Sequence, residues 1–274
     1  MNIVDAQVHI WAADTPERPW PKGGPAKPQR PGVYLAEDLL AELDEGGVNQ
    51  AIVVPPSWEG DRNDLALAAA RDYPDRLAVM GRLDVHDPNA RENLANWRRQ
   101  PGMLGIRLTV RTEEEIRFVT DRQWDWIWAQ AAESSVPIMF FPYGHLHHVE
   151  ALASRHPDVK LTIDHLAAYR TQGPAAFADL EQLISLARHP NISVKASAVP
   201  FYSAQPYPFA DTHDVLHRVF DAYGPQRMFW GSDITRQRCP LSQVVRLFTE
   251  ELPWLHGEDL AWVMGRGVQQ WLGW

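Results

Sequence analysis

The chain has 274 residues, of which 45% are hydrophobic, 22% charged and 10% aromatic, a composition typical of a globular protein with a large core. The formal net charge of −9, from 26 basic and 35 acidic residues, repels phosphate backbones and acidic lipid surfaces. We therefore expect neither a nucleic-acid nor a membrane partner. The sequence shows no apolar run of roughly 20 residues and no signal peptide, which predicts a cytoplasmic protein.

Eight short apolar runs rich in β-branched residues recur along the chain, separated by stretches with helical periodicity. The runs cover residues 3–8, 51–54, 77–83, 104–108, 137–141, 160–163, 192–196 and 228–230. Strands that alternate with helices are typical of a parallel sheet. Eight units predict an α/β fold with a closed (β/α)8 TIM-like barrel that fills residues 1–274 as a single domain. An open doubly wound sheet is less suitable, because no Gly-x-Gly-x-x-Gly follows the first run.

Residues 12–31 interrupt this alternation because they are crowded with proline and glycine. The segment is too long for an ordinary connection between a strand and a helix. We expect it to lie over the C-terminal face of the barrel, either as a partly ordered lid with Trp11 and Trp20 or as a variable surface loop. A second irregular segment, residues 200–210, carries aromatic side chains such as Tyr202 to the same face as a candidate pocket wall.

Three polar residues follow different predicted strands. His9 ends the first, His165 ends the sixth and Asp233 ends the eighth. Because all strand ends of a parallel barrel meet at one rim, we expect these side chains to converge there. Two imidazoles and a carboxylate at a barrel mouth can hold a divalent metal or position a water molecule for attack.

Five segments in this order resemble the amidohydrolase superfamily, and within it the amidohydrolase-2 branch that includes pyrone-dicarboxylate lactonase. They are residues 4–11, 105–107, 163–166, 194–197 and 229–233. The resemblance covers almost the whole chain and implies a distorted barrel with its site at the C-terminal face. It also implies that His9 is the second histidine of the His-x-His pair, that His165 is the middle-strand histidine, and that Asp233 is the general base.

Gln7 stands where the family usually has the first histidine of that pair. An amide oxygen is a weaker zinc ligand than an imidazole nitrogen. Further histidines are absent at the ends of the fifth and seventh strands, where Phe141 and Lys195 stand. These departures favour a site without a cofactor, and the alternative is one zinc ion held weakly by His9, His165 and Asp233.

Without a metal, Asp233 would take a proton from the attacking water, and His9, His165 and Gln7 would donate hydrogen bonds to the developing oxyanion. The remaining candidates are substrate-binding residues: Arg107, Lys195, Tyr143 and Trp11. Arg107 is suited to a substrate carboxylate because its guanidinium is a planar fork. The structural alternative for Arg107 is a salt bridge to Asp84 or Glu59 at the barrel rim. Lys195 could contact the substrate or, alternatively, pair with Asp233.

The sequence therefore predicts a hydrolase that opens a lactone, or a similar activated ester ring, of a small carboxylated or aromatic-derived molecule. A non-oxidative decarboxylase acting on an aromatic or enol-type acid is the first alternative, since the same rim residues could protonate a carbon. A barrel that binds a small molecule without turnover is the second alternative, prompted by Gln7. Tryptophan-rich surfaces could form a subunit interface, so the sequence allows a homo-oligomer as well as a monomer.

Overall fold

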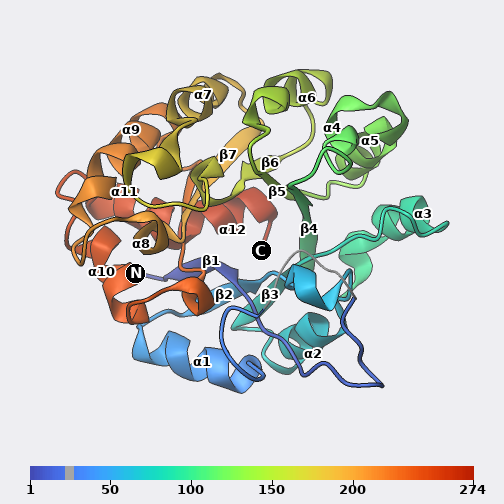
Figure 1. Cartoon of the computed structure of the whole chain (residues 1–274), viewed down its shortest axis with the longest axis horizontal. Helices are drawn as coiled ribbons and strands as arrows, with labels where there is room; N and C mark the ends of the chain where they lie inside the picture. The colour runs from blue at the N-terminus through green and yellow to red at the C-terminus, as the bar shows by residue number, and fades with distance from the viewer. Residues whose placement is uncertain (22–27) are drawn as a thin grey trace.

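The computed structural model describes residues 1–21 and 28–274 and confirms the predicted α/β barrel. Within the described residues, one sheet contains eight parallel strands in sequence order, and helices surround it (Figure 1). The strands are β1 (Val4–Val8), β2 (Gln50–Val53), β3 (Leu77–Gly81), β4 (Met103–Val110), β5 (Ile138–Pro142), β6 (Leu161–Ile163), β7 (Ile192–Ser197) and β8 (Met228–Gly231). Each predicted run therefore contributes a strand.

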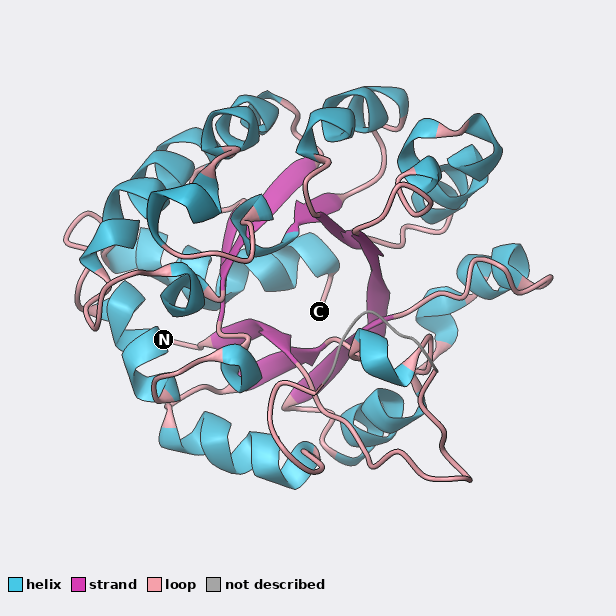
Figure 2. Cartoon of the chain, in the orientation of Figure 1, coloured by secondary structure: helices cyan, strands magenta, loops and turns pink. Residues whose placement is uncertain are grey.

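Helices lie around the strands and, for the last helix, across one end of the barrel, as Figure 2 shows by colour. They are α1 (Ala36–Glu45), α2 (Asp64–Asp72), α3 (Ala90–Ala95), α4 (Arg117–Thr120), α5 (Asp125–Glu133), α6 (Val149–Arg155), α7 (Leu180–Ser185), α8 (Val199–Tyr202), α9 (His213–Tyr223), α10 (Leu241–Thr249), α11 (Gly257–Ala261) and α12 (Gly267–Leu272). None of the helices in the described part of the chain is long and apolar enough to cross a membrane.

The end of β8 joins the end of β1 through polar contacts. The Asp5 carboxylate accepts hydrogen bonds from the backbone N–H groups of Gln7 (3.0 Å) and Ser232 (2.7 Å). The N–H of Asp233 donates to the carbonyl oxygen of Gln7 at 2.8 Å. These bonds fix the end of β1 against the end of β8, and so they bring Gln7 and Asp233 together.

Apolar side chains fill most of the barrel interior toward its N-terminal end, where α12 lies behind the strands in the view of Figure 1. Val268 and Leu272 of α12 are buried in one cluster with Ala6, Met139 and Phe229 from the strands. Helix α12 therefore fills the N-terminal opening, and the polar strand ends are left at the opposite, C-terminal face. This is the face at which barrel enzymes carry their chemistry.

The proline- and glycine-rich segment is described at both of its ends, whereas residues 22–27 lie outside the described residues. A backbone bridge between Trp11 and Tyr34 closes the segment at its base. Arg30 donates to both carboxylate oxygens of Glu42 and to the carbonyl oxygen of Ile234, which follows β8. The end of the segment is therefore anchored at the C-terminal face, beside the predicted site.

Candidate active site

A cavity of about 160 Å³ lies at the C-terminal ends of the strands. Every strand except β3 contributes to its wall, directly or through the segment that follows the strand. The lining residues are Gln7, His9, Gln29, Pro56, Ser57, Trp58, Arg107, Arg111, Phe141, His165, Arg170, Tyr202 and Arg236. Gln29 comes from the segment over the barrel, so this segment takes part in the site.

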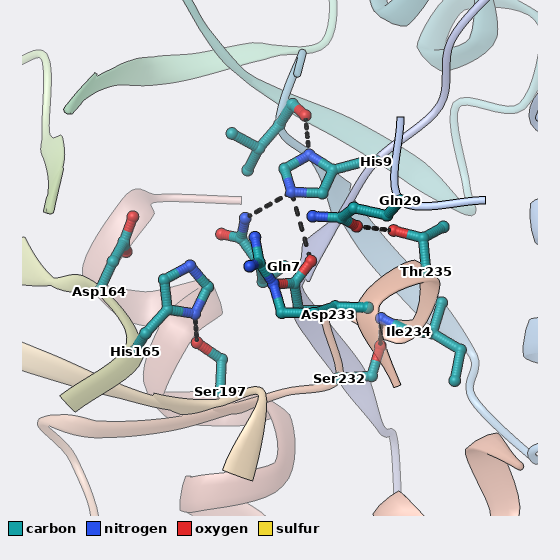
Figure 3. A network of polar contacts seen from close by, with 12 residues as sticks. Gln7, His9, Gln29, Asp164, His165, Ser197, Ser232, Asp233, Ile234 and Thr235 are labelled. Carbon is teal, nitrogen blue, oxygen red and sulfur yellow. Dashed lines mark hydrogen bonds and ion pairs between the residues drawn. The ribbon is translucent and has the colours of Figure 1, made fainter. Parts of the chain in front are cut away.

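His9 holds three polar contacts at the end of β1. Its Nδ1 lies 2.6 Å from the carbonyl oxygen of Val54, and its Nε2 lies 3.2 Å from Nε2 of Gln7 and 3.3 Å from Oδ1 of Asp233. Figure 3 shows Gln7, His9 and Asp233 pointing toward one another. The predicted convergence of the first and eighth strand ends is therefore present in the structure.

Asp233 is fully buried behind this group and does not itself line the cavity. Its Oδ2 accepts a hydrogen bond from Nε of Arg236 at 2.7 Å. Burial alone would raise the pKa of this carboxyl group, but the charge of Arg236 opposes burial and helps to hold the pKa well below its ordinary value. Asp233 is therefore ionised at neutral pH, and its backbone has a left-handed φ of 47°, a conformation that is strained for a non-glycine residue.

His165 stands on the other side of the group in Figure 3, where its Nδ1 contacts the Ser197 hydroxyl at 2.9 Å. Burial lowers the pKa of His165 to about 3, although the carboxylates of Asp233 and Asp164 oppose this shift. The ring is therefore neutral at neutral pH. When the Ser197 hydroxyl donates to Nδ1, the other ring nitrogen carries the proton and is a hydrogen-bond donor for a ligand in the cavity.

Arginine side chains dominate the charge of the cavity. Arg107 donates from Nε to Oδ2 of the buried Asp164 at 2.8 Å, and Arg236 is paired with Asp233. Among the described residues, Arg111 and Arg170 form no ion pair with a carboxylate. Burial and the nearby guanidinium groups, first of all Arg107, lower the pKa of Arg111 to about 9. The cavity therefore has positive charge that the protein itself does not neutralise.

Three of the predicted substrate-binding residues do not line the cavity. Trp11 is fully buried against Trp58 and Tyr34, because its ring fills the space under the proline-rich segment. Tyr143 packs on Phe141 instead of facing the cavity. Lys195 is fully buried below the cavity, where it pairs with Asp164 at 2.7 Å and not with Asp233.

The structure also assigns a different partner to Arg107. Its carboxylate is Asp164, which directly follows β6, and the alternatives Asp84 and Glu59 are not paired with it. Glu59 instead pairs with Arg18. Because Asp164 holds only Nε of Arg107 in a hydrogen bond, the outer nitrogens of this guanidinium are available to a ligand.

Sequence reasoning missed three of the four cavity arginines: Arg111, Arg170 and Arg236. Arg111 follows β4 directly, and Arg236 lies three residues after Asp233 in the turn that follows β8. Their proximity to predicted strand ends is a signal that could have identified them. Arg170 follows β6 by several residues in an irregular segment, and no sequence pattern indicates its position.

The side chains at the strand ends offer few donor atoms to a zinc ion. Within the described residues, no three His, Cys, Asp or Glu side chains are grouped so that they could hold a metal. The Asp233 carboxylate is bonded to Arg236, and Oε1 of Gln7 accepts a hydrogen bond from the Lys195 ammonium at 2.5 Å. Two protein cations therefore hold the oxygen of Gln7 and one of the two oxygens of Asp233. The donor set that is left does not fit a zinc ion.

The chain is similar to known proteins over nearly its whole length. A family model described as Amidohydrolase matches residues 4–265, which is nearly the whole chain. The chain belongs to the amidohydrolase family. As a member of this family, the protein is a hydrolase.

Individual relatives of this amidohydrolase are distant. An L-fucono-1,5-lactonase from Burkholderia ambifaria is 26% identical over 268 residues, which cover 92% of this chain and 85% of that protein. A solved structure from Acinetobacter baumannii, described as a probable 2-pyrone-4,6-dicarboxylic acid hydrolase with citric acid bound, is 17% identical at a TM-score of 0.79, with 100% of both chains covered. An amidohydrolase from Burkholderia multivorans with bound zinc is 21% identical at a TM-score of 0.80, with coverage of 100% and 99%. At these identities the solved structures support the fold.

Proposed function

We propose that this amidohydrolase opens the lactone ring of a small compound that carries at least one carboxylate, without a metal ion. The observation that supports this most strongly is the composition of one cavity. It combines the His9 ring, which contacts Asp233, with four arginines and no acidic lining residue. The contact between His9 and Asp233 is suited to proton transfer, and the arginines are suited to an anionic substrate.

The substrate carboxylates would bind to the arginines that lack a protein partner. Arg111 and Arg170 are not paired with a carboxylate among the described residues, and the depressed pKa of Arg111 shows that its charge is unfavourable in the free protein. A bound carboxylate would compensate for this charge by a charge-assisted hydrogen bond. The outer nitrogens of Arg107 would orient the same group or a second one.

The attacking water would lose its proton to His9 and Asp233 acting together. Asp233 is ionised but fully buried, whereas His9 reaches the cavity. In the described part of the chain, Oδ1 of Asp233 accepts no hydrogen bond, although Nε2 of His9 lies 3.3 Å away. A proton that arrives at Nε2 would therefore be stabilised by a carboxylate that is already in place.

The water oxygen would form a bond to the carbonyl carbon, and the carbonyl oxygen would become an oxyanion. The neutral His165 would donate a hydrogen bond to this oxyanion. Collapse of the intermediate would break the bond between the carbonyl carbon and the ring oxygen, and the ring oxygen would take up the proton held by His9. The product would be a single ring-opened hydroxy acid.

The names of the relatives support this reaction class. Two relatives, from Burkholderia ambifaria and Burkholderia multivorans, are L-fucono-1,5-lactonases, each 26% identical to this chain. The Acinetobacter structure described above takes its name from a dicarboxylic acid. Lactone hydrolysis is therefore common to these relatives, and the arginines of this chain indicate the acidic member of that substrate class.

The test is an assay of lactones that share one ring and differ in the number of carboxylates. We expect kcat/KM to rise by at least about tenfold per carboxylate, because each charge-assisted pair contributes on the order of 1.5 to 3 kcal/mol. This preference should decrease in Arg111→Met and Arg170→Met. Equal rates for neutral and acidic lactones, or no lactone turnover at all, would reject the proposal.

Product analysis separates the two alternatives. A 5-carboxyvanillate decarboxylase from Sphingomonas paucimobilis shares the fold at 15% identity and a TM-score of 0.73, and a decarboxylase would release carbon dioxide from an acid in the same cavity. A barrel that only binds would retain acidic ligands and turn over none of them. The hydroxy acid as sole product is expected only from lactone hydrolysis.

A further inference from the structure

Lys195 of β7 is fully buried directly below the cavity. Burial lowers the pKa of its ammonium group, and the Asp164 carboxylate, 2.7 Å away, opposes this shift and favours the charged form. The ammonium group contacts Oε1 of Gln7 at 2.5 Å and Oδ1 of Asp164 at 2.7 Å. The carbonyl oxygen of Ala6 and the sulfur of Met139 complete its surroundings at 3.3 and 3.1 Å. An ammonium group has three donors and no acceptor, so Gln7, Ala6 and Met139 accept its hydrogen bonds, and Asp164 is paired with it by charge.

This contact decides which way the Gln7 amide is turned. An amide has an acceptor end and a donor end, and the acceptor oxygen of Gln7 is the atom that faces Lys195. The donor nitrogen consequently faces Nε2 of His9, at 3.2 Å. Turning the amide around would place its N–H groups against the ammonium and its oxygen against His9. The buried cation makes that arrangement unfavourable.

The other side of the His9 ring agrees with this orientation. Nδ1 of His9 lies 2.6 Å from the carbonyl oxygen of Val54, and a carbonyl oxygen can only accept. Nδ1 must therefore carry a proton. Nε2, which receives the N–H of Gln7, is then the nitrogen with the free lone pair.

We propose that Lys195 is a positioning residue that acts on His9 through Gln7. By fixing the Gln7 amide, the buried ammonium keeps Nε2 of His9 unprotonated while Asp233 lies beside it. Its effect on catalysis rests on the proposed function, because an unprotonated Nε2 is what the proposed proton transfer requires. The location of the proton on His9 does not depend on any substrate, and it can be measured in the free protein.

The ¹⁵N NMR spectrum of the histidine rings, recorded at mildly alkaline pH, distinguishes a protonated from an unprotonated ring nitrogen. The signals of His9 are assigned as those lost in His9→Gln. We expect Nε2 to be unprotonated in the wild-type protein. In Lys195→Met the amide is free to turn its oxygen toward Nε2, where Asp233 also lies. We therefore expect Nε2 to carry a proton in addition to the one on Nδ1, and kcat to fall by about 10²-fold, the scale of a lost proton acceptor, with less change in KM.

Two further variants separate this role from a general effect on packing. Gln7→Glu keeps an acceptor for Lys195 but has no N–H for His9, and we expect it to protonate Nε2 as well. Met139→Leu changes a neighbour of the ammonium at nearly constant volume and leaves the contact with Gln7 intact. We expect its His9 spectrum to match that of the wild-type protein.

Removing one charge from the buried pair could unfold the protein. The double variant Lys195→Met with Asp164→Asn removes both charges and provides a second measurement. The proposal would be overturned if Gln7→Glu and a folded Lys195 variant, either Lys195→Met or the double variant, both retained the wild-type His9 spectrum. A shifted spectrum in a protein that hydrolyses no lactone would instead leave Lys195 in its positioning role and reject the proposed function.

Discussion

At the scale of single residues, the central feature is the Asp233 carboxylate, which is charged although it is buried. Asp233 is fully buried between Arg236 and His9, and its pKa lies well below the ordinary value. A carboxylate of low basicity is a poor proton acceptor by itself. Beside His9 it has a different use, because it stabilises the imidazolium that forms when Nε2 takes a proton.

This arrangement predicts that Asp233→Asn loses turnover and retains binding. The amide keeps the shape of the side chain but has no negative charge to stabilise protonated His9. We expect kcat to fall by about 10²- to 10⁴-fold, while calorimetry shows a nearly unchanged affinity for a non-hydrolysable acidic analogue. Asp121→Asn, which alters a carboxylate outside the cavity lining, serves as the control. Undiminished kcat in Asp233→Asn would remove this residue from the mechanism.

A second prediction at this scale concerns metal. Arg236 holds one carboxylate oxygen of Asp233, and Lys195 holds the amide oxygen of Gln7, so both residues are weakened as zinc ligands. We therefore expect elemental analysis of protein purified without added metal to find well under one zinc per chain. Treatment with a chelator should leave lactone hydrolysis unchanged. Stoichiometric zinc, or activity that chelation removes and zinc restores, would contradict this interpretation of the site.

At the scale of elements, the ends of three neighbouring strands of the barrel turn in an unusual way. His165 after β6, Ala198 after β7 and Asp233 after β8 all have positive φ angles, between 47° and 60°. Non-glycine residues adopt this conformation at a cost of about 1 to 3 kcal/mol each. The strand ends therefore direct their side chains at the expense of local stability, a cost that the packed barrel must offset.

The spacing of β4 and β5 illustrates that packing. A side-chain carbon added at Gly105 would lie 2.3 Å from the carbonyl oxygen of Pro137 and 2.8 Å from the end of Met80. We expect Gly105→Ala to lower the free energy of unfolding by about 2 kcal/mol or more, because the backbone of the neighbouring segment must move. Denaturant unfolding followed by circular dichroism measures this loss.

Gly257 provides the matched control for that substitution. It has a positive φ of 58°, and no atom lies within 4 Å of the added carbon. Gly257→Ala should therefore cost only the left-handed conformation, about 1 kcal/mol. A smaller loss for Gly105→Ala than for Gly257→Ala would show that β4 and β5 are not held at the distance described here.

At the scale of the whole molecule, two buried groups make stability depend on pH in opposite directions. Burial raises the pKa of Asp5 from 3.8 to about 7, so its contribution is complete below pH 3.8 and is lost as the pH rises through 7. Burial lowers the pKa of His165 from 6.5 to about 3, so its contribution is complete above pH 6.5 and is lost as the pH falls through 3. Between these pH values, Asp5 makes the unfolding free energy fall with rising pH, whereas His165 makes it rise.

Because of this opposition, the prediction is made for a difference between two proteins. Asp5→Asn retains an oxygen for the N–H groups of Gln7 and Ser232 but has no charge to bury. Relative to Asp5→Asn, the wild-type protein should lose up to about 1.4 kcal/mol of unfolding free energy per pH unit from pH 4 to pH 7. Urea unfolding at several pH values measures the difference. A constant difference would mean that Asp5 titrates normally.

Much of the fold could be predicted because it depends on local patterns. Each apolar run became a strand, since short runs rich in β-branched residues suit a buried strand of a parallel sheet. Strand ends at one rim follow from parallel topology, and this placed His9, His165 and Asp233 correctly at the C-terminal face. Arg107 was predicted to be at the cavity, but its partner Asp164 was not, because ion pairs across a barrel depend on the register between strands.

The sequence by itself determined the barrel, its order of strands and the rim at which the polar residues gather, because periodicity and topology need no knowledge of distant contacts. Only the tertiary structure decided that Lys195 lies below the cavity and that Trp11 is buried outside the cavity lining. It also decided that Arg111 and Arg170 line the cavity without a carboxylate partner among the described residues. Burial and charge compensation arise between residues far apart in the chain, so no local pattern contains them.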